Sequence, residues 1–325
     1  MAKIGIMPPQ KSGPFAGPPT FMNVPFSTDL SNSHAAILGV PFDCGIHPTR
    51  IGSRTGPAAI REQSLLVRPF QPPHATWNPL ERLNLIDVGD ADTTPSVLEE
   101  SFEEIETAAF TILDADAAPL CLGGDGAISL PLLRAAKRKH PDIAVLHIDA
   151  HTDTYPGDGN ALHDRYNVAT TFTRAAEEGL VDLYNSFHVG ARGPVMLADV
   201  FEHTREQGYN LIDGTELFEK GLAKTAKALC GQLAGKKVYL CFDMDFFDPS
   251  CAPGVCTPTW GGASAREGLG FLQALAGIDF IGADINTVSP PHDLGGMTAF
   301  LAGTVAVEIL TLLCLSPSIK QKIAG

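Results

Sequence analysis

The sequence predicts an α/β protein in which helices cover both faces of a mostly parallel, doubly wound sheet, giving three layers. Short apolar runs of strand length alternate along the chain with longer segments whose apolar residues recur at helical spacing. The strand segments are apolar at consecutive positions, as expected for parallel strands buried on both faces. Because ligands in such folds bind beyond the carboxyl ends of the strands, we expect a functional site at that edge.

The expected elements follow one another along most of the chain. A first strand over 35–42 precedes a helix over 56–66 with Pro57 in its first turn, and four prolines favour a loop over 67–80. Further strands are expected at 83–88, 119–122, 144–148, 186–190, 237–242 and 280–285, and further helices at 96–115, 128–139, 168–178, 215–232, 265–276 and 297–315.

We expect these elements to form a single domain over residues 34–325. The chain has 325 residues, of which 44% are apolar, so a sizeable core is possible. Residues 1–33 are rich in Pro and Gly and lack periodicity, which predicts an extended arm lying on this subunit or on a neighbour. The apolar stretch 300–315 is short and contains Glu308, so it is expected to be a core or interface helix.

The charge and the cysteine content restrict the classes of partner. A net charge of −14 argues against nucleic acid as a partner, because such binding usually needs a face rich in Lys and Arg. No membrane or secretion signal is expected. The seven cysteines are odd in number and lie mostly in apolar runs, as reduced thiols would. These features predict a cytoplasmic protein whose partners are small molecules or other subunits.

Two acidic segments, 147–153 and 241–249, each follow an expected strand. Carboxylates gathered at neighbouring strand ends repel one another unless a cation neutralises them, and carboxylates with an imidazole suit a divalent metal ion. One such segment alone could supply only turn formers and helix caps. Two segments together favour a metal site, whose candidate ligands are Asp149, His151, Asp153, Asp243 and Asp245.

With these segments in place, the chain resembles the ureohydrolase family of arginases, agmatinases and guanidino-acid hydrolases, and its agmatinase branch more than the arginases. The resemblance covers nearly everything from Ala35 onward. Its motifs are Gly39-Val40-Pro41-Phe42-Asp43, Gly56-Pro57-Ala58-Ala59-Ile60-Arg61, Gly123-Gly124-Asp125, the two acidic segments, Ala252-Pro253-Gly254, Ser264-Ala265-Arg266-Glu267-Gly268-Leu269 and Val288-Ser289-Pro290-Pro291.

The resemblance implies an arginase-like fold and a pair of divalent ions, manganese or nickel. In that family the ions activate a water molecule for attack on a guanidinium carbon, which releases urea or a related product. Carried over by motif, Asp149 and Asp243 bridge the two ions. His151 and Asp245 then complete one ion's ligands, and Asp153 belongs to the other ion.

Three positions depart from the family pattern. Gly126 stands where the family has a histidine ligand to the same ion as Asp153, and glycine has no side chain to donate. Val168 stands where the best alignment places a histidine that shuttles protons. Thr287 replaces a glutamate that pairs with the substrate guanidinium, a charged contact that a hydroxyl cannot make. Nearby His163 or Asp164 remains a candidate base in place of Val168.

These departures leave two main hypotheses. The first is a catalytically impaired subunit that binds one ion or none and assembles with an active paralogous chain. This resembles the non-catalytic partner chain of two-subunit biguanide (metformin-type) hydrolases. The second is an active guanidine, agmatine, guanidino-acid or biguanide hydrolase with a modified site. A pure binding protein for a guanidino compound is a third class. The resemblance also implies an oligomer, a trimer or a hexamer.

Overall fold

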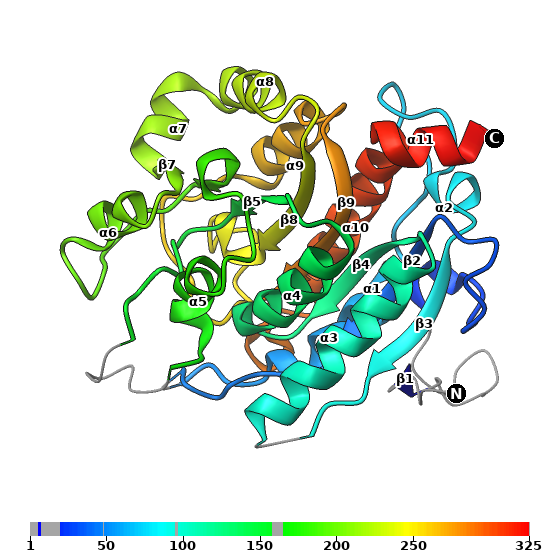
Figure 1. The fold of residues 1–325 in the computed structure, drawn as a ribbon, viewed down its shortest axis with the longest axis horizontal. Coiled ribbons are helices and arrows are strands. Elements are labelled where there is room, and N and C mark those ends of the chain that lie inside the picture. Colours follow the sequence, from blue (N-terminus) through cyan, green and yellow to red (C-terminus); the bar gives the residue numbers. More distant parts are fainter. Residues whose placement is uncertain (1–5, 8–19, 48, 95–96, 158–164, 325) are drawn as a thin grey trace.

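The computed structural model describes residues 6–7, 20–47, 49–94, 97–157 and 165–324. Their strands form one nine-stranded sheet with the order β1-β3-β2-β4-β9-β8-β5-β6-β7 (Figure 1). β1 pairs with β3 antiparallel at one edge, and the other strands are parallel. The strands are β1 (Ile6–Met7), β2 (Ala35–Val40), β3 (Ile86–Ala91), β4 (Ala118–Gly123), β5 (Ala144–Ile148), β6 (Phe187–Val189), β7 (Asn210–Ile212), β8 (Lys237–Asp243) and β9 (Asp279–Asn286).

Helices cover both faces of the sheet (Figure 1). Alternate residues of the central strands enter two separate hydrophobic clusters, so that Leu240 of β8 packs on one face and Tyr239 on the other. α1, α8, α9 and α10 contribute to the first cluster, and α3, α4 and α5 to the second. The helices are α1 (Gly56–Ser64), α2 (Pro79–Arg82), α3 (Leu98–Asp114), α4 (Ser129–Lys139), α5 (Thr171–Glu177), α6 (Val200–Glu206), α7 (Gly214–Lys220), α8 (Leu222–Gln232), α9 (Ala265–Ala274), α10 (Met297–Leu315) and α11 (Pro317–Ala324).

The three-layer architecture expected from the sequence is confirmed. A single helix over 215–232 is wrong, because Gly221 has a positive φ of 85° that ends α7 and separates it from α8. β7 was not expected, since three residues are too few for a strand pattern to show, and α6 was not expected either. α2 overlaps the end of the loop expected at 67–80 and continues to Arg82.

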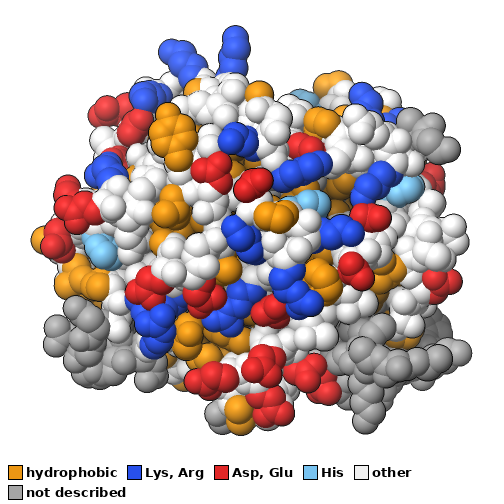
Figure 2. All heavy atoms as spheres, in the orientation of Figure 1, with side chains coloured by type: hydrophobic (Ala, Val, Ile, Leu, Met, Phe, Trp, Pro, Cys, Tyr) orange, Lys and Arg blue, Asp and Glu red, His pale blue; other side chains and the backbone are white. Residues whose placement is uncertain are grey.

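The outer surface over α3 and α4 carries charged side chains of both signs, interspersed as Figure 2 shows. Arg134 and Arg138 of α4 pair with Glu178 and Glu106, which lie at the end of α5 and on α3. These exposed pairs contribute little to stability individually, but they connect neighbouring helices of the same layer.

The N-terminal segment and the apolar C-terminal helix both pack on the domain. Phe21 is fully buried in the core, and its amide donates to the Asp87 carboxylate at 2.9 Å, so residues 20–33 lie on this subunit. Residues 1–5 and 8–19 of the predicted arm lie outside the described residues. α10 is long and apolar enough to span a membrane, but 83% of its apolar stretch is buried within the protein, as in a core helix.

Candidate metal centre

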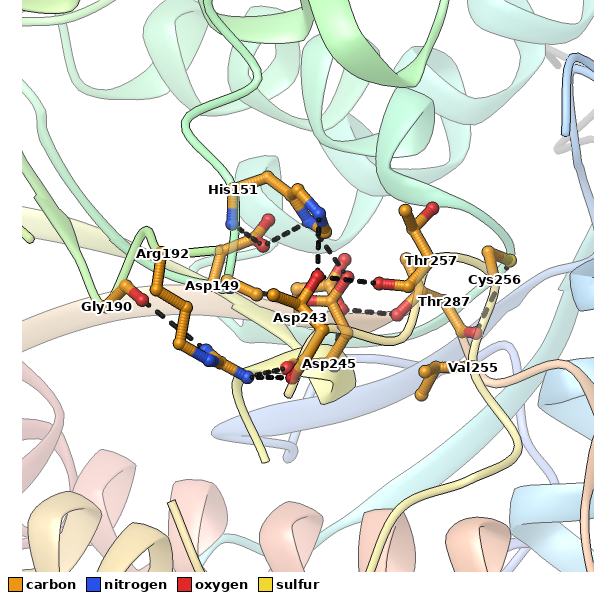
Figure 3. Close-up of polar contacts among 12 residues, drawn as sticks. Asp149, His151, Gly190, Arg192, Asp243, Asp245, Val255, Cys256, Thr257 and Thr287 are labelled. Atoms are coloured by element: carbon orange, nitrogen blue, oxygen red, sulfur yellow. Dashed lines mark hydrogen bonds and ion pairs between the residues drawn. The ribbon is translucent and has the colours of Figure 1, made fainter. Parts of the chain in front are cut away.

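The two acidic segments meet at the carboxyl ends of neighbouring strands, β5 and β8. Ile148 of β5 pairs with Phe242 of β8, so Asp149 and Asp243, the next residues in each segment, emerge side by side. A short 3-10 turn then carries Asp245, whose carboxylate accepts a hydrogen bond from the Ala150 amide at 3.1 Å. Figure 3 shows these side chains pointing toward one another.

Asp149, His151 and Asp245 form the most complete group. His151 Nδ1 lies 3.3 Å from Asp149 Oδ1 and 3.1 Å from Asp245 Oδ2. One potential ligand atom from each of the three residues lies within 4.8 Å of the others. An imidazole nitrogen with carboxylate oxygens suits manganese, nickel or zinc, so these residues fit one divalent ion.

A second group consists of His147, Asp149 and Asp153, whose potential ligand atoms also lie within 4.8 Å of one another. His147 Nε2 is already 2.8 Å from Asp149 Oδ2, however. The Asp153 carboxylate is 8% exposed and accepts no hydrogen bond within the part of the chain that the structure describes. Asp153 also has a positive φ of 50°, which is uncommon for a residue with a side chain.

The electrostatics of these buried carboxylates favour a cation. Burial and the nearby Asp149 raise the pKa of Asp153 well above its usual value, and burial with Asp245 and Asp149 does the same for Asp243. Although burial acts to raise the pKa of Asp149, His147 and His151 hold that pKa well below its usual value. Too few protein cations therefore face the cluster, and a divalent ion would supply the missing positive charge.

All three positions that depart from the family pattern line one cavity. The cavity has a volume of about 240 Å³ and is lined by Ile46, His47, Gly126, His151, Asp153, Tyr155, Val168, Ala169, Pro194, Met196, Asp243, Asp245, Thr257 and Thr287. A Cβ atom built on Gly126 would lie 3.2 Å from Asp153 Oδ2 and 3.9 Å from Val168 Cβ. A side chain at position 126 would thus point at Asp153, and glycine leaves that carboxylate without a nitrogen neighbour from this position.

Thr287 is hydrogen-bonded to Asp243 of the second acidic segment. Its hydroxyl donates to Asp243 Oδ1 at 2.5 Å, and the Asp245 amide donates to the same oxygen at 2.7 Å. The φ of Thr287 is 67°, a strained value for a β-branched residue. The hydroxyl therefore faces Asp243 inside the cavity and adds no charge there.

His163 and Asp164, the candidate bases that could replace Val168, lie outside the described residues. Val168 begins a short 3-10 helix that Asn167 caps through a hydrogen bond to the Ala169 amide at 2.9 Å. The Val168 side chain, which lines the cavity, has no group that can transfer a proton.

Sequence reasoning missed several residues around the cluster. His147 contacts Asp149 directly, and Thr259 lies 3.2 Å from His151 Nε2. Arg192 is buried beside β6, where its guanidinium donates to the backbone carbonyls of Asp245 and Thr259 at 2.9 and 2.8 Å. These donations fix the loops that carry the ligands, yet an arginine 53 residues away from Asp245 shows no sequence signal for that role.

The fold and this centre together define an α/β protein with a divalent-metal cradle at the carboxyl ends of β5 and β8. The arginase family model matches residues 33–312, and the chain belongs to the arginase family.

Similar proteins agree with this assignment. Guanidinobutyrase of Pseudomonas aeruginosa is 34% identical over 311 residues, which cover 95% of each chain. The structure of proclavaminate amidino hydrolase from Streptomyces clavuligerus superposes with a TM-score of 0.86 at 31% identity, covering 94% of this chain and 100% of that one. Trypanosoma cruzi formiminoglutamase with Mn²⁺ superposes with a TM-score of 0.80 at 25% identity, covering 92% and 99%.

Proposed function

We propose that this chain is an amidinohydrolase subunit with little or no turnover of its own, which assembles with a catalytically complete chain of the same family. The relatives include a guanidinobutyrase and an amidino hydrolase, so the substrate of the assembly is a guanidino or biguanide compound. The assembly is a trimer or a hexamer of such chains.

The observation that carries this proposal is the buried Asp153 carboxylate, which lies beside Gly126 and accepts no hydrogen bond among the described residues. The Asp149, His151 and Asp245 group can hold one manganese or nickel ion, which when bound would polarise a water molecule. At a second position Asp153 and Asp243 contribute only oxygens, Gly126 offers no side chain, and the nearby His147 already donates through Nε2 to Asp149. Loss of a ligand nitrogen should leave the second position weakly occupied or empty.

The two other changed positions act in the same direction. Thr287 presents a neutral hydroxyl that is already donated to Asp243, so it cannot give a guanidinium the bidentate, charged contact that a carboxylate provides. Val168 presents only methyl groups to the cavity where a proton must be exchanged. Binding of the substrate guanidinium, activation of water by the metal ions and proton transfer are thus all weakened.

An active hydrolase with a modified site is the second candidate, and one observation favours it. The Asp149, His151 and Asp245 group is intact and opens into a cavity of about 240 Å³. Apolar side chains such as Ile46, Val168 and Met196 line part of that cavity, which suits a guanidine bearing an apolar substituent.

Turnover by the purified chain separates the two candidates. The chain should be loaded with manganese or nickel and assayed for urea release from guanidine, agmatine, guanidinobutyrate and metformin. We expect no turnover, and steady release from any of these compounds would refute the inert subunit. Co-expression with an arginase-family chain from the same genome that has histidine, histidine and glutamate at the three changed positions should give a mixed oligomer in native mass spectrometry.

A further inference from the structure

Behind the metal centre, two buried histidines form a chain of hydrogen bonds that ends on Asp149. His147 of β5 and His188 of β6 are direct register partners on neighbouring parallel strands. Their Nδ1 atoms lie 2.8 Å apart, and His147 Nε2 lies 2.8 Å from Asp149 Oδ2. Neither histidine lines the cavity, and both are at most 1% exposed.

Aromatic side chains hold the His188 ring in place. The ring packs edge-on against Phe172 and Tyr209, with centroid distances of 4.9 and 4.6 Å and interplanar angles of 90°. The Tyr209 hydroxyl donates to the Phe172 carbonyl at 2.9 Å, which ties these two neighbours together. These contacts hold the His188 ring with its Nδ1 toward His147.

The positions of the protons decide which group donates at each step of this series of hydrogen bonds. The Asp149 carboxylate can only accept, so His147 Nε2 donates to it; in the tautomer with one proton on the ring, His147 Nδ1 is an acceptor. His188 Nδ1 must then carry the proton that lies between the two rings, which leaves His188 Nε2 bare. That nitrogen is buried and has no hydrogen-bond partner among the described residues. A buried lone pair without a donor costs less than a buried N–H without an acceptor, so the structure favours this direction.

We propose that His188 is a positioning residue for the metal centre: it orients His147, which in turn holds the Asp149 carboxylate in the rotamer that presents it to the ion. The inference rests on the metal site proposed above. With Oδ2 held by His147 and Oδ1 accepting from the His151 amide at 2.6 Å, both oxygens of Asp149 are fixed before an ion arrives. Outer partners of this kind typically change metal affinity by about 10–100-fold.

Two substitutions at His188 separate positioning from packing. His188→Leu keeps an apolar side chain in the core but removes the donor, whereas His188→Asn is smaller and places an amide N–H at the position of Nδ1. We expect the Kd for Mn²⁺, measured by calorimetric titration, to rise about 10–100-fold in H188L and to stay nearer the wild-type value in H188N. A packing role predicts the opposite order. Thr225→Val removes a buried hydroxyl on α8 that has no hydrogen-bond partner among the described residues and takes no part in the histidine chain, so it serves as the matched control.

The proton positions offer a test that needs no metal. In the metal-free chain labelled with ¹⁵N-histidine, NMR should show His188 protonated at Nδ1 and His147 protonated at Nε2, with H188N identifying the His188 signals. His188 protonated at Nε2, or equal loss of Mn²⁺ affinity in H188L and H188N, would overturn the inference. A wild-type chain that binds no manganese would overturn the proposed metal site, and the NMR result would still decide whether His188 holds Asp149 through His147.

Discussion

Replacing Gly126 with histidine should give the chain a second ion without making it an enzyme. A Cβ at this position meets Asp153 Oδ2 at 3.2 Å and Val168 Cβ at 3.9 Å, so the new imidazole would enter the cavity beside Asp153. The closer contact is tight by a few tenths of an ångström, but its partner is the end of a side chain and can move. Because Thr287 and Val168 remain unchanged, guanidinium binding and proton transfer should stay impaired.

The size of the effect follows from mass action. An ion present at 100 times its Kd stabilises the folded chain by about 2.7 kcal/mol, which for a chain of this length corresponds to a rise in Tm of roughly 5 °C. Metal content by plasma mass spectrometry and Tm with added manganese should therefore both increase in Gly126→His. Gly231→His is the matched control, because a Cβ on Gly231 meets nothing within 4 Å. Unchanged metal content, or rapid hydrolysis by Gly126→His alone, would refute the reasoning.

Three further changes test separate parts of the account. Thr287→Glu should strengthen binding of guanidinium ion by about 1.5–3 kcal/mol in calorimetry, the value of a hydrogen bond to a charged group; equal binding by Thr287→Gln would contradict a role for the charge. Burial raises the pKa of Asp284 to about 6, above its unfolded value, so its contribution to stability is present at pH 4 and is lost as the pH rises through 6. Between pH 4 and pH 7, the free energy of unfolding measured with urea should fall by about 3 kcal/mol less in Asp284→Asn than in the wild type. Exposed Asp199→Asn should leave this fall unchanged. Arg192→Lys removes the guanidinium whose Nη2 donates to both carbonyls and should lower the free energy of unfolding by about 1–3 kcal/mol, and an unchanged urea midpoint would argue against that role.

The layers of the fold and the placement of the two acidic segments at one edge of the sheet could be predicted from the sequence because both depend on local patterns. β5 and β8 are apolar at consecutive positions, and a residue that follows such a strand must lie at the carboxyl edge of a parallel sheet. That rule places Asp149 and Asp243 at one edge of the sheet, and the pairing of β5 with β8 makes them neighbours. β7 escaped prediction because its three residues include polar Asn210 and are too few to show a period.

The residues that surround the ligands could not be predicted, because contacts between distant segments place them there. His147 lies within an apolar strand, where a histidine is ordinarily a core residue, and only the pairing of β5 with β6 brings His188 to it. Arg192 reaches the carbonyls of Asp245 and Thr259 through the arrangement of three loops. The bond from Thr287 to Asp243 likewise appears only once β8 and β9 are paired.

The number of manganese ions bound per wild-type chain, measured together with urea release, tests the central claim most directly. The Asp149, His151 and Asp245 group offers an imidazole that lines the cavity, whereas His147 of the second group is already hydrogen-bonded to Asp149 and does not line it. We predict at most one ion per chain at saturating manganese and no urea from agmatine or guanidinobutyrate. Two tightly bound ions with steady turnover by the chain alone would contradict it.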